Sequence, residues 1–124
     1  MPGKKILIID DDPKNIFALV ATLHANGYQT CTASGADEGI QTLESDSGIG
    51  LVLLDMMMPE MDGYEALPLI RSKKNLSGLP VIAVTAQAMK GDREKCLEAG
   101  ANDYISKPID VDHLFSLLDL HLKK

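Results

Sequence analysis

The chain has 124 residues, of which 45% are hydrophobic and 24% are charged, and its formal net charge is −6. A chain of this length can bury a core as one soluble domain without metal or disulfide staples, and no apolar run approaches the ~20 residues of a membrane span. The acidic balance argues against direct nucleic-acid binding, which requires a basic face.

The first part of the chain predicts two pairs of a strand and a helix. KILIID at 5–10 is a strand candidate. The helix predicted at 14–27 has apolar residues at i, i+3, i+4 and i+7 before a stop signal, Asn-Gly. YQTCTA at 28–33 predicts a weaker, more polar strand nearer a sheet edge. The helix predicted at 36–45 contains Gly39, which weakens it by about 1 kcal/mol.

The middle of the chain predicts a fully buried strand. GLVLLD at 50–55 is apolar up to its last residue, Asp55, as in a parallel strand that is covered on both faces. A helix is predicted from Asp62 to Ser72, with Pro68 either marking its first turns or bending it. Asp55 therefore either caps a turn or ends the strand at a place where chemistry happens.

The last part of the chain predicts two further pairs. LPVIAVTA at 79–86 is a strand candidate, and the next helix runs from Asp92, its expected N-cap, to Ala99. NDYIS at 102–106 predicts a short strand, and the segment at 111–122 predicts the last helix.

These five pairs follow one another through connections too short for a linker or a second domain, so we expect one domain over residues 1–124. The alternation favours an α/β fold, with a parallel sheet, helices on both faces and right-handed crossovers. In such sheets function gathers at the carboxyl ends of the strands, around the point where the strand order reverses.

Candidate site residues, most of them polar, stand at four of the five predicted strand ends. They are Asp10, Asp11 and Asp12 after the first strand, Asp55 in the third, Thr85 and Ala86 in the fourth, and Lys107 and Pro108 after the fifth. Taken singly, each has a structural interpretation; Asp12 before Pro13, for example, suits a helix N-cap. Taken together they predict a site, because parallel strands bring their ends to one edge of the sheet.

The charges at this edge predict metal-assisted chemistry. Asp10, Asp11 and Asp55 would crowd three carboxylates, which raise one another's pKa and destabilise the fold unless a cation relieves them. All-oxygen ligation suits a hard ion, Mg²⁺ or Mn²⁺. With the ammonium of Lys107 and a hydroxyl nearby, Asp55 is the expected nucleophile of a phosphoryl-transfer site.

Four segments resemble the receiver domains of response regulators, the phosphoacceptor modules of two-component signalling. They are IIDDDP, LVLLDMMMPEMDG, VIAVTA and AGANDYISKP, in the family's order and at family-like spacing. The resemblance covers essentially the whole chain. It implies a flavodoxin-like, doubly wound sheet of five parallel strands in the order 2-1-3-4-5, with five helices. It also implies a protein that is no enzyme beyond assisting its own Mg²⁺-dependent phosphorylation and dephosphorylation.

The resemblance assigns roles at the acidic edge. Asp10 and Asp11 would hold the metal ion, together with Asp55 and the backbone carbonyl of Met57. Asp55 would be the phosphoacceptor, and Lys107 would pair with the phosphoryl group. The donor would be the phosphohistidine of a histidine kinase or of a phosphotransfer domain.

The resemblance also assigns the residues that report phosphorylation. Thr85 would bond a phosphoryl oxygen beside the small Ala86, and the aromatic switch residue Tyr104 would then rotate inward. The bond to Pro108 would be cis. Gln87, together with Met57, would flank the route of the hydrolytic water. The surface that changes would be formed by the fourth helix, the fifth strand and the fifth helix.

Three methionines, Met56, Met57 and Met58, follow the acceptor position directly. We interpret Met56 and Met58 as core or gap-filling residues. An apolar Met57 beside the water route is hypothesised to slow hydrolysis and so to lengthen the phosphoryl lifetime.

The last helix carries more apolar residues than one stripe needs. Its predicted inward stripe is Val111, Leu114, Leu118 and Leu122, and the residues off that stripe are Phe115, Leu117 and Leu120. Exposed apolar excess on a small domain often marks a partner site. We therefore expect effector binding or self-association through the surface of the fourth helix, the fifth strand and the fifth helix. We expect no membrane contact by this domain.

Three other functions fit parts of the pattern. A pseudo-receiver would lack at least one site group, a flavin or nucleotide protein would need a Gly-rich phosphate cradle after the first strand, and an aspartyl hydrolase would carry a second acid at Met57. Two distant cysteines, Cys31 and Cys96, are typical of reduced thiols and favour the cytoplasm. The chain suits either a stand-alone regulator or a receiver of a hybrid histidine kinase, which its AMKGDREKCLEAGANDYISKPI segment favours.

Overall fold

The computed structural model describes residues 4–86 and 91–122, within which strands and helices alternate as the sequence predicts. The first half of the chain contains β1 (Lys5–Ile9), α1 (Pro13–Ala25), β2 (Thr30–Ala33), α2 (Ala36–Ser45) and β3 (Ile49–Asp55). The second half contains α3 (Gly63–Ser72), the 3₁₀ turn η1 (Lys74–Leu76), β4 (Val81–Thr85), α4 (Asp92–Ala99), β5 (Asp103–Ser106) and α5 (Val111–His121). Gln87 lies outside the described residues.

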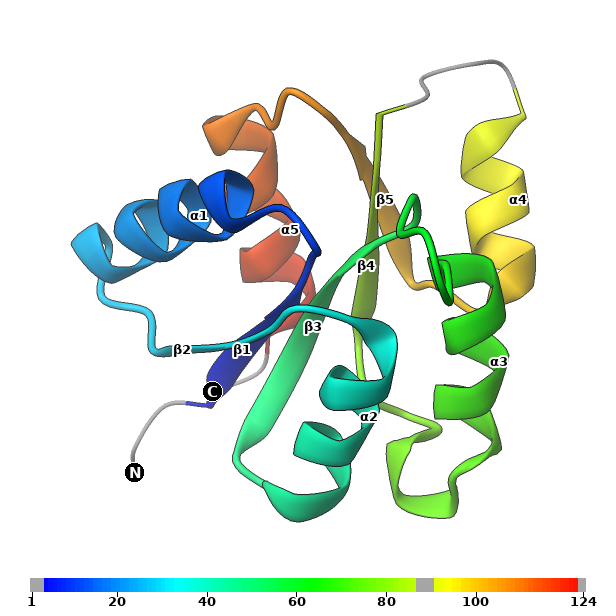
Figure 1. The fold of residues 1–124 in the computed structure, drawn as a ribbon. Helices are drawn as coiled ribbons and strands as arrows, with labels where there is room; N and C mark the ends of the chain where they lie inside the picture. Colours follow the sequence, from blue (N-terminus) through cyan, green and yellow to red (C-terminus); the bar gives the residue numbers. More distant parts are fainter. Residues whose placement is uncertain (1–3, 87–90, 123–124) are drawn as a thin grey trace.

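The strands form one parallel sheet in the order β2-β1-β3-β4-β5. Helices α1 and α5 cover one face, and α2, α3 and α4 cover the other (Figure 1). The predicted fold class and strand order are confirmed. Because the order reverses between β1 and β3, the ends of these neighbouring strands lie at the place where such sheets bind ligands.

Side chains of the central strands alternate between two buried clusters, as the pleat of a strand requires. In β1, Leu7 and Ile9 face the layer of α2, α3 and α4, whereas Ile6 and Ile8 face α1 and α5. Every residue of β3 is buried, which explains why its sequence is continuously apolar. The strand that ends at Asp55 is therefore fixed from both faces.

The structure corrects several predicted boundaries. Strand β2 begins at Thr30 and β4 spans Val81–Thr85, so both are shorter than the segments that predicted them. Asp92 is not the N-cap of α4; the cap is Gly91, whose φ of 95° lies in the left-handed region that glycine adopts without strain. Pro68 lies beyond the first turn of α3, on its exposed side, and the helix continues to Ser72.

The predicted stripe of α5 is partly wrong. Leu114 and Leu118 are buried as expected, but Leu117 is buried with them, while Val111 is 43% exposed. Leu120, expected off the stripe, is 62% exposed. The face that packs on the sheet follows i, i+3, i+4 from Leu114. Val111 lies on the same side, but at the first position of the helix, where it lines a pocket between α1 and α5 instead of packing in the core. Within the described ranges, no helix is both long and apolar enough to cross a bilayer.

Gly39 is expected to resist replacement by alanine, although alanine favours helices by about 1 kcal/mol. A Cβ at Gly39 would collide with the side chain of Ile9, with 2.8 Å to Cγ1. Overpacking of this kind costs about 1–3 kcal/mol, so Gly39→Ala should lower the free energy of unfolding in urea. Ile9→Val removes Cδ1, the nearer of the two colliding atoms, but keeps Cγ1, so in that background Gly39→Ala should cost less than in wild type. The same loss in both backgrounds would contradict the collision.

Candidate functional site

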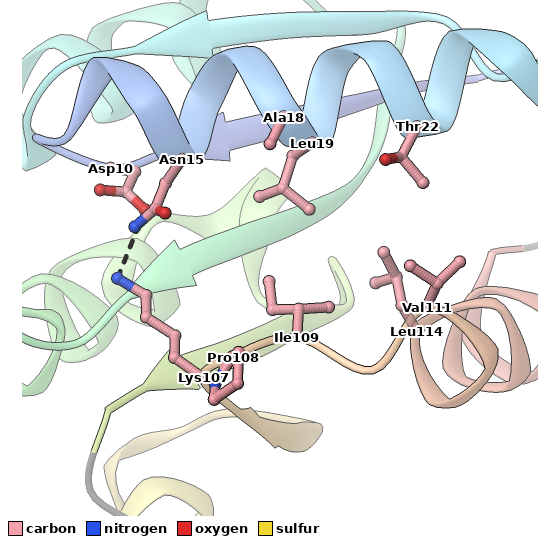
Figure 2. A pocket seen from close by; sticks show the side chains of 10 residues that line it. All are labelled: Asp10, Asn15, Ala18, Leu19, Thr22, Lys107, Pro108, Ile109, Val111 and Leu114. Carbon is pink, nitrogen blue, oxygen red and sulfur yellow. Dashed lines mark ion pairs between the residues drawn. The ribbon is translucent and has the colours of Figure 1, made fainter.

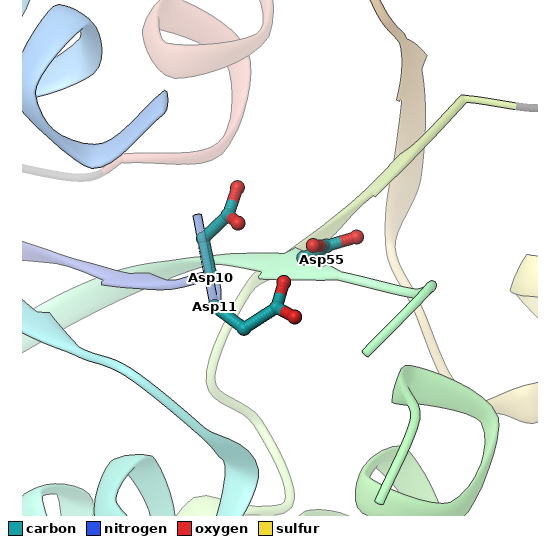
Figure 3. A group of neighbouring side chains, drawn as sticks. All are labelled: Asp10, Asp11 and Asp55. Carbon is teal, nitrogen blue, oxygen red and sulfur yellow. The ribbon is translucent and has the colours of Figure 1, made fainter. Parts of the chain in front are cut away.

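Three carboxylates at the ends of two neighbouring strands come together at the carboxyl end of the sheet. Asp10 and Asp11 follow β1, and Asp55 is the last residue of β3 (Figure 3). One oxygen from each lies within 4.8 Å of the others, and Asp11 is exposed whereas Asp10 and Asp55 are almost completely buried. The cluster is therefore open to solvent on the Asp11 side.

The acids after β1 differ in role, although the sequence repeats the same residue. Asp10 accepts a hydrogen bond from the backbone N–H of Asp12 at 2.8 Å. Asp12 caps α1 by accepting from the N–H of Lys14 at 2.9 Å, with Pro13 at the first helical position. Asp12 is therefore an N-cap, as its simplest interpretation predicts, while Asp10 faces the cluster.

Each oxygen of Asp55 has its own partner. Oδ1 accepts a hydrogen bond from the backbone N–H of Met57 at 2.9 Å. Oδ2 lies 3.5 Å from Nζ of Lys107, which also lies 3.6 Å from Oδ2 of Asp10. One ammonium thus lies between two buried carboxylates that come from different strands, and it offsets only one of their two charges.

The residues present fit a hard divalent cation. Burial raises the pKa of Asp10, and the nearby charge of Asp55 raises it further, while the N–H of Asp12 and the charge of Lys107 act in the opposite direction. Three carboxylates with one ammonium leave an excess of negative charge in a partly buried place. An all-oxygen donor set of this kind suits Mg²⁺.

Two further predicted site residues lie at the same carboxyl end of the sheet. Thr85, the buried last residue of β4, pairs in register with Ser106 of β5, and its carbonyl accepts from the N–H of Lys107 at 2.7 Å. Ala86 follows Thr85 and is exposed. The Lys107–Pro108 bond is cis, as the resemblance implies. The backbone bond to Thr85 therefore places Lys107 at the end of β4.

The remaining predicted residues lie around this centre. Met56 and Met58 are buried in the core, in agreement with their interpretation as packing residues, whereas Met57 is 46% exposed. Tyr104 is half-buried against the core that α3 and α4 cover, and burial raises the pKa of its phenol. Neither observation tests the role assigned to Met57 or to Tyr104, so both roles stay predictions.

The tight approach of α3 to the acceptor loop was not predicted from the sequence. Gly63, the first residue of α3, has no room for a side chain, because its Cβ would lie 2.9 Å from the Cα of Met56. Asp62 and Glu65 form a capping box that begins the helix there. The pattern Asp-Gly-Tyr-Glu contains both residues of the capping box, so this helix start could have been recognised in the sequence.

A pocket of about 250 Å³ lies between α1 and α5, beside the acidic cluster (Figure 2). Asp10, Asn15 and Lys107 form its polar end, and Leu19 and Ile109 belong to its apolar wall. The sequence did not predict this pocket, because its lining comes from two helices that are nearly a hundred residues apart along the chain.

The fold and this acidic edge are those of a receiver domain. The sequence profile of the response regulator receiver domain matches residues 6–119, so the chain belongs to that family and is a module of two-component signalling. Receiver domains are generally signalling modules without an enzymatic activity of their own, and they bind Mg²⁺ at an acidic site. The family therefore supports the predicted class of protein over the flavin, nucleotide and hydrolase alternatives.

Individual relatives agree with this assignment. The chain is 38% identical to part of the histidine-protein kinase BarA of Escherichia coli, over 91% of this chain but only 12% of the kinase. It is 34% identical to the polar-differentiation response regulator DivK of Brucella ovis, over 96% of both chains. The receiver domain of the sensor kinase PA1611 of Pseudomonas aeruginosa, solved with magnesium in its active site cleft, is 35% identical, with a TM-score of 0.88 and 98% coverage of both chains.

Proposed function

We propose that the whole chain acts as one phosphoacceptor domain, in which Asp55 takes the phosphoryl group from a phosphohistidine. A carboxylate oxygen of Asp55 attacks phosphorus, the bond from phosphorus to the histidine nitrogen breaks, and the histidine retains the bonding electrons. The observation that carries this proposal is the setting of Asp55, which ends a rigid buried strand beside two further acids and one ammonium.

Other groups of the chain would orient the acceptor, pair with the phosphoryl group and hold the metal ion. The N–H of Met57 orients Asp55 by holding Oδ1. Among the described ion pairs, the cation that pairs with Oδ2 of Asp55 is Lys107. Lys107 is therefore suited to pair with a phosphoryl oxygen after transfer. Asp10, Asp11, Asp55 and the carbonyl of Met57 would hold Mg²⁺, which would neutralise charge that develops on the phosphoryl oxygens.

Thr85 and Tyr104 are the proposed switch. Thr85 ends the strand next to the acceptor, and Tyr104 lies on the adjoining strand β5. Helix α4, all of whose residues the structure describes, buries only Cys96, which supports a lightly packed element that a local change can displace. The surface of α4, β5 and α5 would then present a different face to an effector or to a second copy.

The proposed donor is a histidine kinase or a phosphotransfer domain. Phe17 of α1 is 77% exposed on the helix that walls the pocket beside Asp10, and an exposed aromatic residue supports a protein-contact surface there. The similarity to BarA supports a receiver within a hybrid kinase, and the similarity to DivK supports a stand-alone regulator. The free cysteines Cys31 and Cys96 support a reducing cytoplasm.

Beryllofluoride, which imitates a phosphoryl group on a carboxylate, tests this proposal. Adding Mg²⁺ and beryllofluoride together to labelled protein should shift the backbone amide signals of Asp55, Thr85 and Lys107. Mg²⁺ alone should affect mainly the residues around Asp10, Asp11 and Asp55. If the two additions leave these signals unchanged, the domain is a pseudo-receiver that works as an interaction module.

Met57→Asn is expected to shorten the lifetime of the phosphorylated protein. The polar amide can hold a water molecule near the acceptor, where the exposed thioether of Met57 offers only weak hydrogen bonding. The gain of about one hydrogen bond corresponds to roughly a two- to tenfold faster loss of label. The measurement is the decay of radiolabelled phosphate after the donor is removed, and an unchanged decay would refute the idea.

A further inference from the structure

We propose that Met57 is an oxidation-sensitive modulator of the phosphorylation site, so that a peroxide shortens the lifetime of phosphorylated Asp55. The inference rests on the proposed role of Asp55 as the acceptor and adds a form of regulation at the same site. It follows from two features of the loop after β3: the contrast in exposure among its methionines, and the contact of Met57 with the acceptor.

The three consecutive methionines differ sharply in access to solvent. Met57 is 46% exposed, whereas Met56 and Met58, on either side of it, are 1% and 6% exposed. Met61, further along the loop, packs against the core and is only partly exposed. Because thioether oxidation requires contact with a dissolved oxidant, Met57 should react before its neighbours.

The position of Met57 connects its oxidation to the acceptor. Its backbone N–H donates to Oδ1 of Asp55 at 2.9 Å. The Cα that carries the Met57 side chain therefore lies within about 4.4 Å of that oxygen. Close packing of Met56 against Gly63 fixes the loop from the other side. A change in the Met57 side chain therefore occurs beside the acceptor without opening the core.

The chemistry of each step balances. A peroxide transfers one oxygen atom to the thioether sulfur of Met57, which is oxidised to the sulfoxide, and the peroxide is reduced to water or an alcohol. The sulfoxide oxygen is a strong hydrogen-bond acceptor where the thioether was a weak one. A water molecule held there can attack phosphorus, which releases inorganic phosphate and a proton and restores the carboxylate of Asp55.

The first measurement is the site of oxidation. Folded wild-type protein is treated with hydrogen peroxide, and proteolytic peptides are weighed by mass spectrometry at intervals. Oxygen should appear on Met57 about tenfold faster than on Met56 or Met58, because burial excludes the oxidant from those two. Equal rates at the three positions would overturn the proposal.

The second measurement is the phosphoryl lifetime. Wild type, Met57→Leu and Met57→Gln are labelled by a phosphodonor, with and without prior peroxide treatment. Oxidised wild type should lose its label about two- to tenfold faster, the effect of roughly one hydrogen bond. Met57→Gln should lose label faster without peroxide, and the decay of Met57→Leu should not respond to peroxide, because leucine has the same apolar character but no sulfur.

The outcomes separate this inference from the function on which it rests. If Asp55 is labelled but complete oxidation of Met57 leaves the decay unchanged, the inference fails alone. If Met57→Leu responds to peroxide as wild type does, another residue is responsible and the inference also fails. If no variant is labelled at Asp55, the acceptor assignment and the inference fall together. Circular dichroism of the oxidised protein should match that of the untreated protein.

Discussion

Asp55→Asn is expected to lower phosphoryl uptake from any competent donor at least about a hundredfold. The asparagine side chain has the same shape but lacks the carboxylate that forms the acyl phosphate. The fold should persist, because the substitution removes one of the crowded acids and so relieves the charge that raises the pKa of Asp10. The measurement is transfer of radiolabelled phosphate from a phosphorylated kinase, with the thermal unfolding midpoint recorded in parallel.

Asp37→Asn provides the matched control, since Asp37 is an exposed carboxylate in the first turn of α2. This variant should accept label at the wild-type rate. Undiminished labelling of Asp55→Asn, at the usual stoichiometry, would show that another residue is the acceptor. An unfolded Asp55→Asn protein would instead show that the carboxylate is needed for folding. In that case Asp55→Glu, which keeps a carboxylate, would be tested for binding of beryllofluoride.

Arg71→Met is expected to destabilise the fold by about 2–4 kcal/mol, because several buried or half-buried carbonyls would lose their donor. The Arg71 guanidinium donates to the carbonyl oxygens of Gly100 at 2.9 Å and Leu79 at 2.6 Å, and to Oδ1 of Asn102 at 2.6 Å. It also donates to the carbonyls of Leu76 and Ser77. One side chain of α3 thus ties together the loops that precede β4 and β5.

Chemical denaturation with urea measures this effect, and two other variants interpret it. Arg71→Lys keeps the charge but not the planar fork of donors, so it should retain only part of the stability. Arg93→Met changes an exposed arginine of α4 and should cost within about 0.5 kcal/mol. If Arg71→Met unfolds at the same urea concentration as Arg93→Met, the five hydrogen bonds contribute nothing to stability.

Much of the fold could be predicted because its signals are local. The apolar run that ends at Asp55 predicts a strand covered on both faces, and β3 is buried throughout. The regular alternation of strands and helices limits the topology, since parallel strands require right-handed crossovers. The resemblance then supplied the strand order, which periodicity alone does not determine. Boundaries were less accurate, as at Thr30 and Gly91, because turn geometry competes with apolar character at the ends of elements.

The sequence by itself determined which chemical groups reach the edge of the sheet: Asp10, Asp11, Asp55, Thr85 and Lys107 stand at strand ends because of their places in the alternation of strands and helices. Only the tertiary structure decided how similar residues differ. It buries Asp10 and leaves Asp11 exposed, and it exposes Met57 between two buried methionines. It also buries Leu117 on α5 in place of Val111. Burial and pairing depend on which distant elements pack together, and local periodicity does not contain that information.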